Sequence, residues 1–74
     1  MTRLMLPLRF RDEANANVCI EASGLFPCGA KAVKGELGWW FIVIDVPTDR
    51  LDRKLNYLRT QTPGIEWQRS EAQP

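Results

Sequence analysis

The chain is 74 residues long, with 45% hydrophobic and 26% charged residues and a formal net charge of +1. This composition is that of one folded domain rather than a disordered segment, and so small a net charge argues against non-specific nucleic-acid binding, which needs a large cationic field. The chain has no histidine, which removes the commonest general base and the commonest metal ligand.

The first third of the chain predicts two strands joined by a loop. Residues 3–11 alternate between apolar and other side chains, which is typical of a half-buried strand. Pro7 cannot donate a hydrogen bond to a neighbouring strand, so this strand is expected at a sheet edge. The polar stretch 12–17 is typical of a hairpin loop, and renewed alternation in 18–23 predicts a second strand.

Glycine and proline interrupt regular structure in residues 24–29, which read GLFPCG. Leu25 and Phe26 are apolar residues in this loop, so they either plug the core or lie exposed as an anchor for a partner. A short third strand is predicted over 30–33, and a tight turn over 34–36.

Residues 39–46, WWFIVIDV, are the strongest predicted strand because they are rich in aromatic and β-branched side chains. Both faces of this strand are apolar. The face expected to meet the core consists of Trp40, Ile42, Ile44 and Val46. The reverse face consists of Trp39, Phe41 and Val43, until Asp45 breaks the row. Such a strand is either covered twice, or covered once and free to bind a partner.

An amphipathic helix is predicted over about 48–62, ending before Pro63. Thr48 or Asp49 is expected to cap its first turn. Its single apolar stripe consists of Leu51, Leu55 and Leu58. A last strand is predicted over 65–70, with its inward side chains being Ile65 and Trp67.

These elements predict an α+β fold, in which a small antiparallel or mixed sheet of four to five strands carries one amphipathic helix on one face. Residues 1–70 are expected to form a single domain and residues 71–74 a frayed tail. The start of the chain has no signal-peptide pattern, and its longest apolar run of six residues is far shorter than a membrane span. We therefore expect a cytoplasmic protein with no membrane partner.

The candidates for catalysis are weak. Paired carboxylates occur in the 12–17 stretch and in the first helical turn, where they are expected to be solvated. The two cysteines, Cys19 and Cys28, lack metal-site spacing, and we expect free thiols, the more reactive being Cys28 near Lys31. We therefore expect no catalytic residue, no metal and no cofactor.

The reverse face of the 39–46 strand is the first candidate binding site. One helix covers only one face of a sheet, so the other face is expected to be free unless the 24–29 loop folds over it. The predicted protein-binding residues are Trp39, Phe41, Val43, Leu25 and Phe26. The same face could also pair with a second copy of the chain in a homodimer.

The helix provides an alternative site for RNA or single-stranded nucleic acid. A helical wheel places a basic flank with one tyrosine beside the leucine stripe: Arg50, Arg53, Lys54 and Tyr57. The same flank could meet an acidic protein surface, or it could be a solvated helix face with ordinary ion pairs.

The strand, helix, PGIEW turn and final strand of the second half resemble the layout of small phage-type proteins that bind and inhibit host machinery. The resemblance covers under half of the chain and assigns no role to any residue. Together with the apolar reverse face, it leads us to expect a non-enzymatic protein-binding module. We expect this module to regulate or inhibit a larger cytosolic assembly, for example a host transcription machine.

Overall fold

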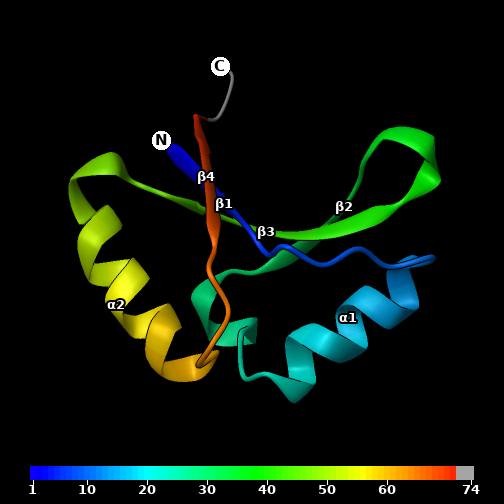
Figure 1. The fold of residues 1–74 in the computed structure, drawn as a ribbon, viewed down its shortest axis with the longest axis horizontal. Coiled ribbons are helices and arrows are strands. Elements are labelled where there is room, and N and C mark those ends of the chain that lie inside the picture. Colours follow the sequence, from blue (N-terminus) through cyan, green and yellow to red (C-terminus); the bar gives the residue numbers. More distant parts are fainter. Residues whose placement is uncertain (72–74) are drawn as a thin grey trace.

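The computed structural model describes residues 1–71, which follow the order β-α-β-β-α-β (Figure 1). The strands are β1 (Thr2–Met5), β2 (Lys31–Lys34), β3 (Trp40–Val46) and β4 (Gln68–Glu71). The helices are α1 (Glu13–Ala22) and α2 (Leu51–Gln61), and the short 3₁₀ turns are Phe26–Cys28, Glu36–Gly38 and Thr48–Arg50. The predicted α+β fold is confirmed.

The four strands form one antiparallel sheet in the order β2-β3-β1-β4. The first and last strands of the chain are therefore neighbours, and β3 and β1 lie inside the sheet. This connectivity is the split β-α-β arrangement of ferredoxin-like folds. Because such folds carry many unrelated functions, the connectivity by itself assigns none.

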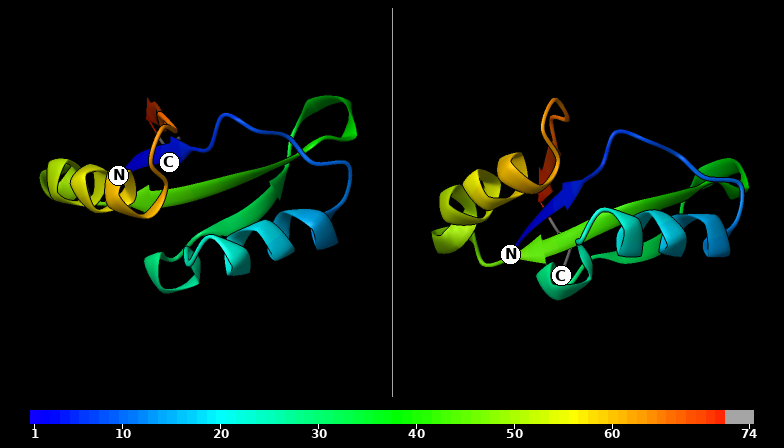
Figure 2. Two further views of the ribbon diagram at one scale, coloured as in Figure 1. Left: turned by 60° about the horizontal axis from the view of Figure 1, so that its bottom comes forward. Right: turned by 90° about the horizontal axis from the view of Figure 1, so that it is seen from below.

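Both helices pack against the same face of the sheet. In the view of Figure 1, α1 lies below the strands and α2 lies to their left. In the left view of Figure 2, α1 lies beneath β2 and β3. One hydrophobic cluster joins the sheet, α1 and α2. From the sheet it includes Leu4, Ile42, Ile44 and Val46, and from the helices Ala16, Ile20, Leu51 and Leu58. The inward face predicted for β3 is confirmed.

The helix predicted over 48–62 is present as a 3₁₀ turn followed by α2, and its leucine stripe faces the core. The predicted side-chain cap is wrong, because neither Thr48 nor Asp49 caps α2. Thr48 Oγ1 instead lies 3.1 Å from Thr2 Oγ1, which ties the start of the helix to β1.

The hairpin loop and strand predicted for residues 12–23 are wrong, because this segment forms α1. Asp12 is the N-cap, and its Oδ1 accepts a hydrogen bond from the backbone N–H of Asn15 at 2.8 Å. Ala16 and Ile20 then face the core together, since residues four apart share a helix face. The sheet therefore has two helices on one face, not one.

The edge strand predicted over residues 3–11 is wrong in extent and position. β1 ends at Met5 and lies between β3 and β4. Pro7 falls in the segment that leads to α1, so its missing N–H interrupts no strand ladder. Phe10 returns to the sheet and forms an isolated antiparallel bridge with Trp40.

A buried tryptophan attaches the C-terminal strand to α2. The indole Nε1 of Trp67 donates to Thr62 Oγ1 at 3.1 Å, and that hydroxyl donates to the Leu58 carbonyl at 2.8 Å. Trp67 is buried and Ile65 is half-buried, as the inward pattern predicts. Of the predicted tail, Glu71 belongs to β4, and residues 72–74 lie outside the described residues.

We expect Leu58→Ala to lower the free energy of unfolding by about 2–5 kcal/mol, because it leaves a cavity where a side chain with 0% exposure stood. Leu37→Ala is the matched control, since Leu37 is 94% exposed, and it should change that free energy by less than about 0.5 kcal/mol. Urea titration followed by circular dichroism measures both. Equal effects would contradict the placement of α2 on the core.

Candidate binding surfaces

The face of the sheet opposite the helices is the first candidate surface, called the open face here. Paired residues of neighbouring strands point to the same side, so the register identifies its members. On β1, β2 and β3 they are Arg3, Met5, Lys31, Val33, Phe41, Val43 and Asp45. Its apolar side chains lie outside the cluster that packs against the helices. Neither of the described helices covers this face.

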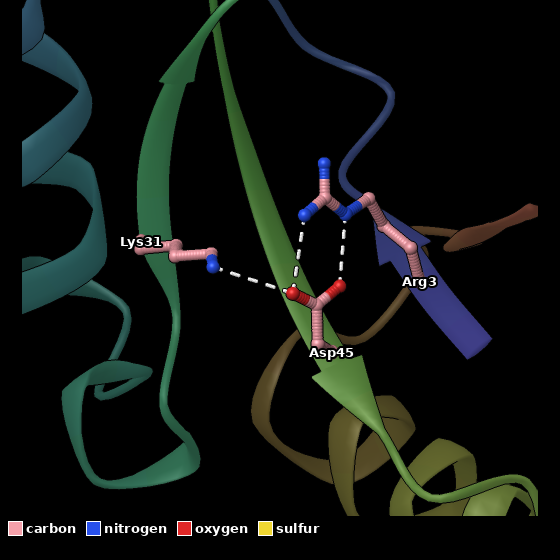
Figure 3. Close-up of polar contacts among 3 residues, drawn as sticks. All are labelled: Arg3, Lys31 and Asp45. Atoms are coloured by element: carbon pink, nitrogen blue, oxygen red, sulfur yellow. Dashed lines mark hydrogen bonds and ion pairs between the residues drawn. The ribbon is translucent and has the colours of Figure 1, made fainter. Parts of the chain in front are cut away.

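An ion triad crosses three strands of the open face (Figure 3). The Arg3 guanidinium donates to both carboxylate oxygens of Asp45, at 2.8 Å from Nε and 3.1 Å from Nη2. The Lys31 ammonium lies 3.3 Å from Asp45 Oδ2. The Arg3 hydrogen bond, with help from Lys31, lowers the pKa of Asp45 from 3.8 to about 2, although burial acts in the opposite direction. One carboxylate for two cations leaves the triad with a net positive charge.

Two arginines gather at Trp39, which continues the open-face row of β3. The guanidinium of Arg9 lies 4.3 Å from the Trp39 ring centroid, and that of Arg11 lies 5.9 Å from it. The bridge between Phe10 and Trp40 explains this arrangement, because it turns the residues on either side of Phe10 toward Trp39.

The positive charge of the chain is concentrated on this side of the sheet. The open face and the Trp39 arginines together hold four cations and one carboxylate, a charge of +3. The whole chain carries only +1, so all remaining residues together carry −2. The low overall charge thus conceals a cationic face, which the sequence analysis did not predict.

The structure brings together only part of the predicted protein-binding set. Trp39 and Phe41 are only partly exposed on the open face, but Val43 is 0% exposed between its paired neighbours, so its prediction as a contact residue is wrong. Leu25 is also wrong as a contact residue. Its N–H donates to the Ile20 carbonyl at 3.0 Å, and its side chain is buried in the helix-side core.

Phe26 lies away from the open face. It is 73% exposed and borders a hollow between α1 and β2. The 24–29 loop therefore plugs the helix-side core with one residue and exposes the next. It does not close the open face.

The basic flank predicted for the helix is present as a continuous surface. Its four residues, Arg50, Arg53, Lys54 and Tyr57, line one shallow hollow of about 260 Å³. Tyr57 is 45% exposed, so its ring is accessible to a ligand. Local helical spacing was sufficient to predict this grouping.

Metal-binding clusters, cysteine pairs and membrane-spanning helices would each indicate another kind of function, and the described residues bear on all three. Within residues 1–71, no three His, Cys, Asp or Glu side chains gather into a group that could hold a metal ion. Cys19 and Cys28 are free thiols, each partly buried. None of the described helices has the length and apolar character needed to cross a membrane.

No protein-family model, no curated protein and no solved structure matches this chain. The surfaces described above are therefore the basis for a functional assignment.

We expect the Asp45 carboxyl to titrate near pH 2 in the folded protein and closer to 3.8 in Arg3→Gln. Because folding lowers this pKa, the triad stabilises the fold above about pH 4, and that stabilisation is lost as the pH falls toward 2. Asp45→Asn should therefore lose less stability than the wild type between those pH values. Carboxyl NMR titration and urea unfolding at each pH measure the two effects, and an Asp45 midpoint at its ordinary value would contradict the triad.

Proposed function

We propose that this chain is a non-enzymatic protein that binds single-stranded nucleic acid on its open face. The observation that carries the proposal is the Trp39 ring with two arginine guanidinium groups near it, on a face with a local charge of +3. Aromatic rings that stack bases, combined with cations that meet phosphates, are the usual means of binding single strands.

The spacing of the two aromatic side chains favours an unpaired strand. Trp39 and Phe41 are two residues apart in extended backbone, so their positions are separated by about 7 Å. This is roughly twice the rise of about 3.4 Å between stacked bases of a duplex. One base of an extended strand would therefore stack on the Arg9 guanidinium that lies over Trp39, and a separate base would meet Phe41. Arg9 enlarges the Trp39 platform, because a guanidinium plane can itself stack on a base.

A protein partner on the open face has weaker support than the sequence suggests. Val43 is buried and Arg9 lies over Trp39, so little continuous apolar surface remains for a protein to cover. Pairing of two copies through this face would bring two charges of +3 together, which opposes a homodimer there. The protein-binding module predicted from sequence is our second candidate function. The observation that favours it is the exposed Phe26 beside the hollow between α1 and β2.

Binding to a short labelled oligothymidylate or oligouridylate should weaken steeply with salt. About three phosphate contacts predict a slope near −2 for the logarithm of the association constant against the logarithm of salt concentration. A rise from about 50 to about 200 mM salt should then weaken binding roughly 20-fold. Fluorescence anisotropy measures this, and absence of binding at low salt would refute the proposal.

Substitutions on the two basic surfaces should separate their roles. Trp39→Ala should weaken single-strand binding by roughly 5- to 150-fold, since it removes one stacking ring. Arg9→Glu should weaken binding and reduce the salt slope. Arg53→Glu makes the same charge change on α2 and is the matched control. A larger loss in Arg53→Glu than in Arg9→Glu would move the site to the basic flank of the helix.

A further inference from the structure

The hollow between α1 and β2 is a groove of about 450 Å³ beside the sheet. One wall is α1, which contributes Glu13, Asn17, Ile20 and Glu21. The other wall is the start of β2, where the small residues Ala30 and Ala32 leave the space unfilled. Phe26 completes the lining.

The groove lies along a free edge of the sheet. Within residues 1–71, β3 is the one strand that pairs with β2. Ile42 and Trp40 of β3 direct their carbonyls to the opposite side, where they accept from Leu6 and Phe10. Antiparallel pairs alternate between bonded and non-bonded, so Ala32 and Lys34, which face Ile42 and Trp40, point their N–H and C=O groups away from β3. These backbone groups are available to another strand.

The charge of the groove indicates which strand would fit. Glu13 and Glu21 stand on the α1 wall, and the one cation of the lining is Lys31. The Lys31 ammonium is held by Asp45 on the open face, which directs its charge away from the groove. Lys34 shares a face of β2 with Ala32 but is not part of the lining. The lining itself therefore presents the two α1 carboxylates, whereas the open face is cationic.

We propose that the groove binds an extended basic peptide segment, which adds to β2 as a fifth strand. Backbone bonds to Ala32 and Lys34 would supply affinity, and side chains facing α1 would supply specificity. Glu13 and Glu21 are two helical turns apart, about 12 Å along the axis. Four residues of an extended strand span about 13 Å, so lysine or arginine at positions i and i+4 would meet both carboxylates.

The position between the two basic residues also has a defined environment. Side chains at i, i+2 and i+4 of a strand point the same way, so the residue at i+2 would face Ala32 and Asn17. Asn17 lies midway between Glu13 and Glu21 on α1. A valine or threonine suits this half-buried site. Phe26 would pack against an apolar residue beyond the basic pair.

A second copy of this chain is a poorer occupant than a basic peptide. Outward backbone groups must meet outward ones, so two antiparallel β2 strands would pair Ala32 of one copy with Lys34 of the other. Each copy would bring Lys31 and Lys34 to this seam, and β2 has no carboxylate to balance them. Lysines along an edge strand are a common means of preventing such pairing.

The test uses the full chain and a labelled, end-blocked peptide with a Lys-Thr-Val-Thr-Lys centre, compared with the same peptide carrying Glu in place of Lys. We expect the basic peptide to bind more tightly and to shift the amide NMR signals of Ala32 and Lys34. Glu13→Lys combined with Glu21→Lys should weaken its binding about tenfold and reverse the preference toward the acidic peptide. Binding of the acidic peptide to the double variant would show that this variant is folded.

Trp39→Ala should leave peptide binding unchanged, so this proposal and the nucleic-acid proposal can fail separately. Equal affinity for both peptides would overturn the groove proposal, as would amide shifts confined to the open face. Concentration-dependent self-association that shifts the β2 amides would identify a second copy as the occupant instead. Groove shifts produced by oligothymidylate and not by the basic peptide would also overturn it.

Discussion

Both helices lie on the same face of the sheet, and most other features of the molecule follow from that arrangement. Ile42, Ile44 and Val46 of β3 are almost completely buried beneath α1 and α2. Each helix contributes only a narrow apolar contact, since α1 has two buried residues and α2 has two. Covering one face therefore uses both helices, and none of the described elements remains for the reverse face.

The open face stays compatible with water because long cationic side chains extend over its apolar residues. Arg3 and Lys31 can lay their methylene stems along the sheet while Asp45 holds their charged ends. Arg9 shields Trp39 in the same way. These residues also concentrate positive charge beside the partly exposed rings of Trp39 and Phe41. The cationic side chains that cover the apolar residues of this face are thus the ones that would attract a polyanion.

The two candidate surfaces differ in charge and in the part of β2 that they use. The open face uses the Lys31 side chain, whereas the groove uses the outer backbone edge of Ala32 and Lys34. Asp45 influences the charge of both surfaces. It holds the Lys31 ammonium on the open face, so the carboxylates of α1 determine the charge of the groove lining. Ligands of opposite charge could therefore bind without competing for the same atoms.

Local patterns in the sequence were sufficient for β3 and α2, because β-branched runs and leucines at helical spacing reflect short-range geometry. The basic flank of α2 was predictable for the same reason. The helix at residues 13–22 was not predictable from local patterns. Only two of its residues, Ala16 and Ile20, are buried against the core, and the alternation of residues 18–23 also fits a strand. Packing of this segment against the sheet is what determined that it forms a helix. Long-range strand pairing alone brought Arg9 to Trp39, because no local pattern encodes a contact between segments so distant in the chain.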